Sequence, residues 1–339
     1  MDGDGTLYIG TAQTYGGDTS IKSGTVVLGG REEYAEQVLA KAFCHLDASK
    51  AGTVVLKEGT ATAEVRSWAD VDGRWTFTQA DTDNDWLFAE KKTAAINGLD
   101  TVFFTGYKNR LDVGNLLWPG FQTMVIVHTV QSGNPPKGWL CAGVVGASGS
   151  DSGIRVNGSA NNVNWSPEHG QYFINGEEGI KLVCDTTYVS TIQLGSEGKK
   201  WATSQIVIGD YWGHGTNHRC YWGNVGEMAF FDTALTPGEQ TAVENALMEK
   251  WGVKSAPVDP TENVLPTTTD LYVAAGATLD LNGCSQTVVS LTGYGTIINT
   301  SSTPAVIVLS EGRVSDFHGT LGEGVTVRRM RKGFAIIYR

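Results

Sequence analysis

The chain has 339 residues, with 25 basic and 36 acidic side chains and a net charge of −11. This acidic balance excludes nonspecific attraction to nucleic acid or to an anionic membrane surface. No apolar run reaches the roughly 18 residues that a transmembrane helix needs, so we expect no transmembrane segment. Glycine is frequent at 43 residues, and ten Trp, eleven Tyr and eleven Phe accompany it, a composition that favours a turn-rich, all-β protein.

The first residues lack the features of a secretory signal. Met1 is followed by Asp-Gly-Asp-Gly rather than by a basic and then an apolar stretch. We therefore expect the chain to be a fragment of a longer protein. Its five cysteines are scattered and show neither the spacing of a zinc site nor the density of a disulfide scaffold, so they do not define the cellular compartment.

Residues 5–30, "GTLYIGTAQTYGGDTSIKSGTVVLGG", predict short strands separated by turns. Apolar side chains alternate at Leu7 and Ile9 and again at Val26 and Leu28, the period of a strand with one buried face. Two or three strands do not form a stable core by themselves. This segment must therefore pack on another part of the chain.

A short amphipathic helix is predicted over 32–43, and glycine-punctuated strands then follow from 53 to about 232. The clearest are 101–106, 123–131, 171–176, 180–184, 204–210 and 227–232. Many short strands at this spacing, with few helices among them, are typical of a β-sandwich.

The best-defined helix begins after Thr236, in "TPGEQTAVENALMEKWG". Thr236 is a good N-cap, Pro237 suits the first helical position, and Glu239 completes a capping box. Val243, Leu247 and Trp251 fall on one face, and Gly252 can adopt the left-handed stop. We expect this face to dock on an apolar surface.

A linker rich in Pro and Thr is predicted over 253–269, and the opening pattern then returns in 270–339. Repeated short strands of this kind belong to stacked β architectures, in which each unit needs a neighbour to cover it. We therefore predict that 1–30, an N-terminal β-repeat segment, pairs with the C-terminal β-repeat segment 270–339. The sandwich, 31–252, is then an insertion in that layer.

Two resemblances support this division. The segment 271–297, with "GATLDLNG" followed by "LTGYG", is similar to the autotransporter-associated β-strand repeat, and 5–28 resembles the other half of the same repeat. The middle of the chain resembles the concanavalin A-like, laminin G-type jelly roll. The motifs that carry this second resemblance are "CHLDAS" (44–49), "VRSWADVDG" (65–73), "IVIGD" (206–210) and "GEMAFFDTALTPGEQTAVENALMEKWG" (226–252).

The resemblances imply an all-β fold: a two-sheet, concanavalin A-like jelly-roll sandwich inserted in or docked on a small solenoid-like β-repeat layer, with two short helices. They also imply a large bacterial surface or secreted protein, and thus an extracellular or cell-surface location. Proteins of the jelly-roll family bind sugars, bind proteins, coordinate Ca²⁺ or hydrolyse polysaccharides, so the fold alone does not define the activity.

Catalytic carboxylates are not evident in the sequence. The glucanase branch of the jelly-roll family carries a Glu-x-Asp-x-x-Glu strand, which is absent here. Glu227 and Asp232 are the nearest acidic residues on a convincing strand, and their spacing directs them to opposite faces. A hydrolase with unlinked carboxylates stays an alternative, although we expect no catalysis.

Two segments are candidate metal sites. Asp81, Asp83 and Asp85 in "DTDND" offer the oxygen ligands that Ca²⁺ favours, but Trp86 and Lys92 stand where an EF-hand has Gly and Glu, so a solvated loop is the alternative. His214 and His218 lie with Cys220 in "HGTNHRC", a partial Zn²⁺ ligand set that is equally typical of polar loop residues.

Clustered aromatic residues indicate sugar binding, because sugar rings stack on aromatic faces while nearby amides and carboxylates bind the hydroxyls. Burial of several of them in the core is the alternative. The segments 209–224 and 161–170 supply the predicted ligand-binding residues Tyr211, Trp212, His214, Asn217, Tyr221, Trp222, Trp165 and Asn162.

These features predict a non-enzymatic module that recognises carbohydrate or mediates adhesion. Its expected partners are an extracellular glycan and neighbouring β-repeat modules of the same protein, with Ca²⁺ as the candidate cofactor. A purely structural stalk or spacer unit is the first alternative, and a glycoside hydrolase of unrecognised family is the second.

Overall fold

A computed structural model gives the fold of the chain. The structure describes residues 3–60, 62–79, 88–106, 109–114, 116–133, 140–147, 153–159, 162–165, 170–194, 200, 206–209, 221–254, 261–310, 313, 315–331 and 334–338. The chain divides into two compact units. Unit 1 comprises Met1–Tyr34 and Pro257–Arg339, and unit 2 comprises Ala35–Ala256.

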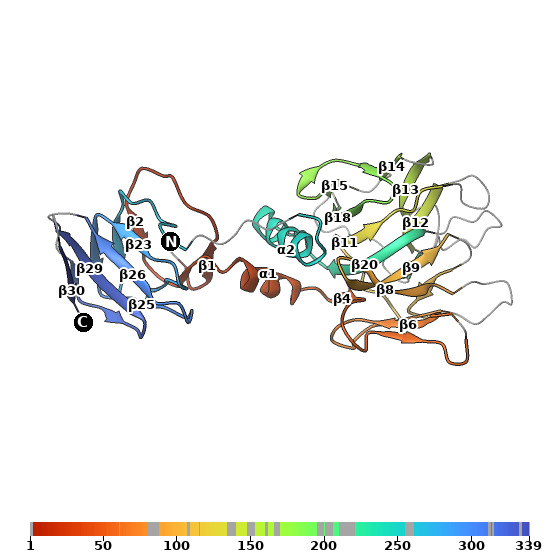
Figure 1. Cartoon of the computed structure of the whole chain (residues 1–339), viewed down its shortest axis with the longest axis horizontal. Coiled ribbons are helices and arrows are strands. Elements are labelled where there is room, and N and C mark those ends of the chain that lie inside the picture. The colour runs from red at the N-terminus through yellow and green to blue at the C-terminus, as the bar shows by residue number, and fades with distance from the viewer. Residues whose placement is uncertain are drawn as a thin grey trace. The chain divides into compact units, whose positions relative to one another are not determined.

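Unit 1 is a β-solenoid whose strands stack in parallel on three faces (Figure 1). The first face contains β2 (Thr19–Ile21), β21 (Asp270–Val273), β24 (Ser290–Gly293) and β27 (Asp316–Phe317). The second face contains β1 (Thr6–Ile9), β3 (Thr25–Leu28), β22 (Thr278–Asp280), β25 (Thr296–Ile298) and β28 (Thr320–Leu321). The third face contains β23 (Gln286–Val288), β26 (Ala305–Leu309), β29 (Val325–Arg331) and β30 (Phe334–Tyr338), of which β30 alone runs antiparallel to its neighbour.

Alternating apolar residues build the core of the solenoid. Strands on all three faces direct every second side chain inward, so equivalent residues of successive turns stack in columns. On the second face, Val26 pairs with Leu279 and Leu279 pairs with Ile297. All three side chains are buried in one cluster, which also includes residues of the first and third faces. The solenoid interior is therefore a continuous apolar column.

The sandwich is inserted within the first turn of this solenoid. The chain leaves after β3, and it returns where Glu262 bridges Ser285 in parallel and Asn263 donates its amide to the Ser285 carbonyl at 2.8 Å. The C-terminal part of the predicted linker 253–269 therefore belongs to the solenoid. Val264 and Leu265 are fully buried in the solenoid core. Residues 255–260 lie outside the described part of the chain.

Unit 2 consists of two antiparallel sheets (Figure 1). The nine-stranded sheet has the order β17 (Lys181–Val183), β14 (Asn162–Trp165), β13 (Gly153–Ser159), β12 (Leu140–Ala147), β19 (Ile206–Ile208), β10 (Leu111–Asp112), β7 (Thr76–Thr78), β6 (Val65–Ala69) and β5 (Val54–Leu56). The eight-stranded sheet has the order β16 (Glu177–Glu178), β15 (Gln171–Ile174), β18 (Thr187–Gln193), β11 (Thr123–Thr129), β20 (Trp222–Phe231), β9 (Leu99–Thr105) and β8 (Glu90–Ile96), and β4 (Cys44–Asp47) also pairs with β20.

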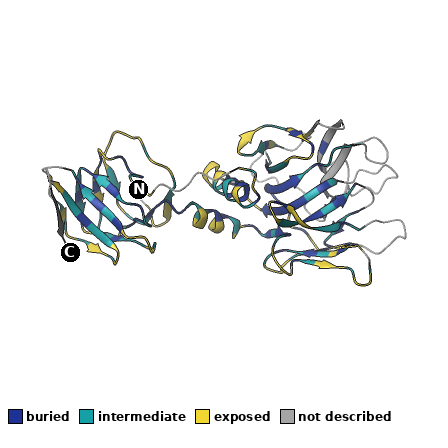
Figure 2. Ribbon diagram, viewed as in Figure 1, coloured by how far each residue is buried: buried dark blue, intermediate teal, exposed yellow. Residues whose placement is uncertain are grey.

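The two sheets of unit 2 share one core. Trp68 and Phe77 from the nine-stranded sheet are buried in the same cluster as Met124 and Phe230 from the eight-stranded sheet. Figure 2 shows the central strands of the eight-stranded sheet as mostly buried along their length. The strands β11 and β20 are buried on both faces. An antiparallel sheet commonly has one face on the core and the other in water. A further element must therefore cover their outer face.

That element is helix α2 (Pro237–Lys250). Its predicted start is confirmed, because the Thr236 side chain accepts from the Glu239 amide and the Glu239 side chain accepts from the Thr236 amide. Its predicted apolar face is buried, and Gly252 has the expected left-handed conformation, with φ of +68°. The expected docking surface is the outer face of the eight-stranded sheet, where the Trp251 ring lies against Gly226.

The other helix, α1 (Arg31–Leu39), is shorter than the predicted 32–43. Its last turn closes through tighter bonds, from Lys41 to the Val38 carbonyl and from Ala42 to the Leu39 carbonyl. Across the described residues the chain is thus all-β, with two helices and a solenoid-like arrangement, as the sequence predicts. No helix among these residues is long and apolar enough to cross a membrane.

Candidate functional site

The outer face of the eight-stranded sheet carries charged residues in the half that α2 covers. Glu227 on β20 is 2% exposed, and both of its carboxylate oxygens are occupied. Oε1 lies 2.6 Å from His45 Nε2, and Oε2 accepts from Lys250 Nζ at 2.6 Å and from Trp251 Nε1 at 2.8 Å. Lys250 also pairs with Asp47 at 2.7 Å. This cluster joins β4, β20 and the C-terminal end of α2.

The ion pairs of this cluster determine the ionisation of its members. Burial alone raises the pKa of the Asp47 carboxyl, but the Lys250 ammonium and the hydrogen bonds from Ser49 hold it below its ordinary value. Burial lowers the pKa of Lys250, yet the two carboxylates beside it raise that pKa above the ordinary value. Both groups are therefore charged at neutral pH, and the cluster is a satisfied ion-pair network that fixes α2.

A second buried carboxyl lies on the middle of α2. Glu244 is 2% exposed, and its Oε1 accepts from Thr191 Oγ1 at 2.6 Å and from Gln240 Nε2 at 2.9 Å. Burial raises the pKa of Glu244 above its ordinary value, although these two hydrogen bonds oppose the shift. Gln240 in turn accepts from Gln193 Nε2 at 2.7 Å, which extends the network to β18.

The remaining half of the same outer face is not covered by α2 and centres on Trp222. The indole is partly exposed and lies between two glycines. A Cβ on Gly106 would stand 2.9 Å from Trp222 Cβ, and a Cβ on Gly133 would stand 3.0 Å from Trp222 Cη2. Both glycines have positive φ, +77° and +118°, so larger residues are disfavoured there by conformation as well as by space. The glycines thus allow the main chain to approach the ring closely.

Polar side chains surround this aromatic residue. Asn224, two residues along β20, accepts from Thr101 Oγ1 at 2.8 Å and donates from Nδ2 to Thr129 Oγ1 at 3.2 Å. Thr105 lies opposite Trp222 on β9. We call this region the Trp222 face and define it by the partly exposed residues Phe103, Thr105, Thr129, Thr187, Trp222 and Asn224.

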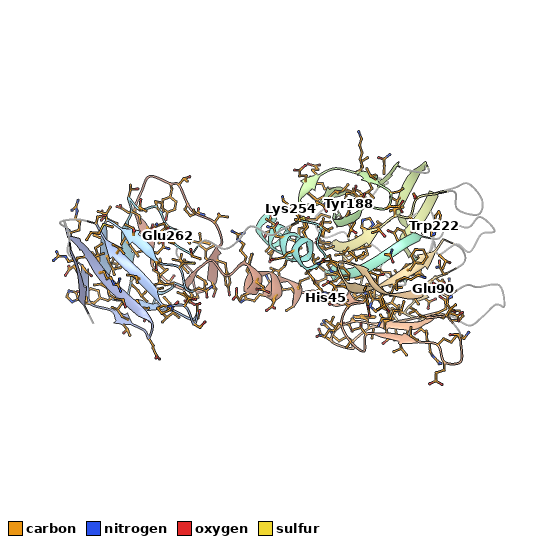
Figure 3. All side chains as sticks on the ribbon, in the orientation of Figure 1. His45, Glu90, Tyr188, Trp222, Lys254 and Glu262 are labelled. Atoms are coloured by element: carbon orange, nitrogen blue, oxygen red, sulfur yellow. The ribbon has the colours of Figure 1, made fainter. Side chains whose placement is uncertain are left out.

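A charged pair borders the Trp222 face on β8. Lys92 Nζ lies 5.3 Å from the centre of the Phe103 ring and forms an ion pair with Glu90. A cation held over an aromatic face is attracted by the ring quadrupole. Figure 3 shows Trp222 and Glu90 toward one end of the sheet and His45 toward the other.

Tyr221, a predicted ligand-binding residue, is instead a core residue. It is fully buried, and its hydroxyl donates to the Thr129 carbonyl at 2.7 Å and lies 2.9 Å from His128 Nδ1. His128 Nε2 in turn lies 3.0 Å from Ser190 Oγ. Burial lowers the pKa of His128 to about 3 and raises that of Tyr221. Alternation along β20 explains the difference, because Tyr221 and Trp222 must face opposite sides of the sheet.

The other predicted site residues are only partly described. Asn162 and Trp165 lie on β14, where they pair in register with Ser159 and Val156 of β13. Predicted residues that lie outside the described part of the chain are Tyr211, Trp212, His214 and Asn217 of the aromatic segment, Asp81, Asp83 and Asp85 of the calcium segment, and His218 and Cys220. Among the residues that the structure does describe, no three His, Cys, Asp or Glu side chains converge as a metal site would require.

The sequence does not predict the ion-pair cluster around Glu227. His45 and Asp47 are far from Glu227 and Lys250 in the sequence, and only the pairing of β4 with β20 brings them beside Glu227. These residues lie in the motifs "CHLDAS" and "MEKWG", which indicated a family resemblance but did not predict that the residues contact one another.

Comparison with known proteins yields only remote similarities. No family model and no curated protein matches the chain. Among solved structures, domain 4 of AbnA, a GH43 extracellular arabinanase from Geobacillus stearothermophilus in complex with arabinotriose, is similar over 60% of this chain and 98% of that one, with 14% identity and a TM-score of 0.34. Trypanosoma rangeli sialidase in complex with 2,3-difluorosialic acid is similar over 63% of this chain and 37% of that one, with 12% identity and a TM-score of 0.35. A function must therefore be argued from the residues of this chain.

Proposed function

We propose that unit 2 is a carbohydrate-recognition module that binds a glycan on the Trp222 face. The observation that carries this proposal is the partly exposed indole of Trp222 between two glycines, with amide and hydroxyl groups beside it. A sugar ring needs one flat aromatic surface for its CH groups and nearby polar groups for its hydroxyls. The Trp222 face offers both on rigid strands.

The predicted residues Tyr211, Trp212, His214 and Asn217 belong to the same aromatic segment, 209–224, as Trp222, so we include them in the proposed site. In this proposal the sandwich is a concanavalin A-like, laminin G-type jelly roll, and the solenoid is built from autotransporter-associated repeats. The whole chain is then a module of a bacterial surface or secreted protein that acts outside the cell.

The module is proposed to be non-enzymatic. A retaining or inverting glycosidase needs two carboxyl groups that face a shared substrate. Glu227 lies beneath α2 with both oxygens engaged by His45, Lys250 and Trp251. Asp232, the other acidic residue considered in the sequence, is exposed, and its Oδ2 lies 3.7 Å from Lys200 Nζ. Glu227 is therefore engaged within the protein rather than presented to a bound sugar.

A second candidate function, a spacer within a longer stalk, is favoured by the solenoid. Solenoids extend by adding turns, and each turn contacts only its neighbours. In this reading the solenoid carries the sandwich at one position of a rod. The two functions are compatible, since an adhesin needs both a binding module and a support.

The proposed function is tested by screening the labelled full chain on a glycan array, with Ca²⁺ and again with EDTA. We expect specific binding that Trp222→Ala abolishes. Tyr294→Ala is the matched control, because Tyr294 is an aromatic residue of unit 1 that is 66% exposed. It should leave binding unchanged.

Circular dichroism and thermal unfolding must show that both variants are folded. Equal loss of binding in the two variants would contradict a site on the Trp222 face, and an array without hits under either condition would leave the spacer role as the better proposal. Binding that EDTA alone removes would instead indicate a Ca²⁺ site at Asp81, Asp83 and Asp85.

A further inference from the structure

The end of the solenoid that carries β1 contains a pocket of about 630 Å³. Its walls are β1, β2 and the chain between them, all within unit 1. Apolar side chains of the solenoid interior form part of the lining, and polar side chains form the rest. The apolar lining includes Leu7, Ile21 and Val26, and the polar lining includes Gln13 and Thr19.

One column of stacked side chains shows that this end of the core is open. On the second face, Leu7, Val26, Leu279, Ile297 and Leu321 follow one another in register. The three middle members are 3%, 0% and 0% exposed, whereas the terminal members Leu7 and Leu321 are 45% and 42% exposed. Exposure therefore depends on whether a further turn covers the side chain, and at Leu7 none does among the described residues.

The order of the strands shows which position is open. In each complete turn, a strand of the first face is followed within a few residues by a strand of the second face: β2 by β3, β21 by β22, β24 by β25 and β27 by β28. β1 extends the second face one strand beyond β3, but in the described residues the first face ends at β2. The pocket lies beside β2 and β1, where the strand that precedes β1 in this pattern would lie.

The arrangement of the strands at this end restricts what can bind beside β2. The opposite end of a second solenoid would bring β27 and β28 together, since those two strands end the first and second faces in the same turn. If β27 were placed beside β2, β28 would fall beside β3, where β1 already lies. A second solenoid docked in this way would displace β1, whereas a single strand beside β2 would not.

We propose that the pocket binds one extended polypeptide strand that runs parallel to β2 and adds to the first face. This is strand addition to a sheet edge, in which main-chain hydrogen bonds supply affinity and side-chain pockets supply specificity. The existing strands define the side chains required. Leu271 and Val273 of β21 are buried, and Tyr272 between them is 40% exposed, so the strand should read apolar–polar–apolar.

A tethered strand tests the proposal on the full chain. We would insert Asp-Leu-Tyr-Val, a copy of Asp270–Val273, between Met1 and Asp2. Residues 2–5 then separate the new valine from Thr6, just as residues 274–277 separate Val273 from Thr278. Tethering raises the effective concentration of a strand that is too short to bind well as a free peptide.

Hydrogen exchange and thermal unfolding are the readouts. We expect exchange of the β1 and β2 amides to slow by about tenfold or more and the melting temperature of unit 1 to rise. The matched control inserts Asp-Ser-Tyr-Ser, which keeps the length and removes the apolar side chains. Equal protection by both insertions, or by neither, would overturn the proposal.

A pair of variants locates the effect. In the chain with the inserted strand, Leu7→Ser should abolish the added protection, because Leu7 lines the pocket. Leu321→Ser changes the equally exposed residue at the other end of the same column and should preserve it. Dimerisation of the unaltered chain with protection of β1 would overturn the single-strand occupant in favour of a second copy. These measurements concern unit 1 alone, so their outcome is independent of glycan binding by unit 2.

Discussion

The two halves of the outer face of the eight-stranded sheet differ in what covers them. One half lies beneath α2, and its polar groups are fully engaged by partners from the helix and from β4. The other half, the Trp222 face, remains partly exposed, although it includes residues of β18 and β20, the same strands that contact α2 in the covered half. The same sheet thus supports a covered layer at one end and a partly exposed surface at the other, and the side chains differ accordingly.

The largest effect should follow removal of the central carboxylate in the covered half. Glu227→Ala leaves Lys250 and the Trp251 indole N–H without their buried partner. Because an uncompensated buried charge is costly, we expect the free energy of unfolding to fall by about 3–5 kcal/mol. All ten Trp lie between residues 68 and 251, so tryptophan fluorescence during denaturation reports on unit 2.

Asp232→Asn is the control for this prediction, since Asp232 is an exposed acidic residue one position beyond β20. It should change the free energy of unfolding by no more than about 0.5 kcal/mol. Similar losses in the two variants would show that the Glu227 cluster does not hold the covered half together.

A smaller loss should follow crowding of the contact between α2 and the sheet. A Cβ at position 226 would stand 2.6 Å from Trp251 Cη2, so Gly226→Ala forces the helix end to shift. Overpacking of this kind costs about 1–3 kcal/mol. Denaturation followed by fluorescence measures the loss, and Gly238→Ala, which places a methyl group in open space on α2, is the matched control. A neutral Gly226→Ala variant would mean that α2 is loosely packed.

In the open half, we expect a more modest effect on stability. Asn224→Ala removes the hydrogen bonds to Thr101 and Thr129, at a cost of about 1–2 kcal/mol. The same variant should weaken glycan binding, because Asn224 is the amide nearest Trp222 along β20. Binding and unfolding are measured on one preparation, and unaltered glycan binding would exclude Asn224 from the proposed site.

The smallest expected effect is a pH dependence from Glu244. Its raised pKa means that the folded protein holds this proton more tightly than the unfolded chain does. This contribution to stability is present below the ordinary Glu pKa and is lost as the pH rises through the raised value. The Glu244→Gln variant has no titrating group at this position, so its stability does not fall for this reason as the pH rises.

The free energy of unfolding of Glu244→Gln, relative to that of the unaltered chain, should therefore rise as the pH increases from the ordinary Glu pKa through the raised pKa of Glu244. Taking the difference between the two proteins removes the contribution of other titrating groups, such as Asp47. A relative stability that improves toward acid pH would contradict the assignment of a buried, proton-holding carboxyl.

Local sequence patterns predict the structural features that depend only on residues close together in the chain. The capping box at Thr236 and Glu239, the stop at Gly252 and the alternating apolar strands of the solenoid all depend on neighbouring residues. These features need no knowledge of the tertiary structure. They were therefore readable in advance.

Features that depend on which strands pair in a sheet could not be predicted from local sequence patterns. Tyr221 and Trp222 are adjacent and chemically alike, and only the register of β20 decides which one enters the core. The Glu227 cluster likewise depends on the pairing of β4 with β20. The return of the chain at Glu262 places residues with a linker-like composition in the solenoid core. Composition alone gives no sign of that.

The insertion point has a consequence for the order of folding. β2 and β3 are synthesised before the sandwich, but the strands that pair with them, β21 and β22, follow only after the whole sandwich has been made. During synthesis, the apolar side chains of β3 must therefore wait for Leu279 and its neighbours. A sandwich that folds early shortens the effective loop that the solenoid has to close, because a folded insert restricts the separation of its two ends. We expect slow or faulty folding of unit 2 to delay the folding of unit 1. This delay would arise only because unit 2 is inserted between strands of unit 1 in the chain.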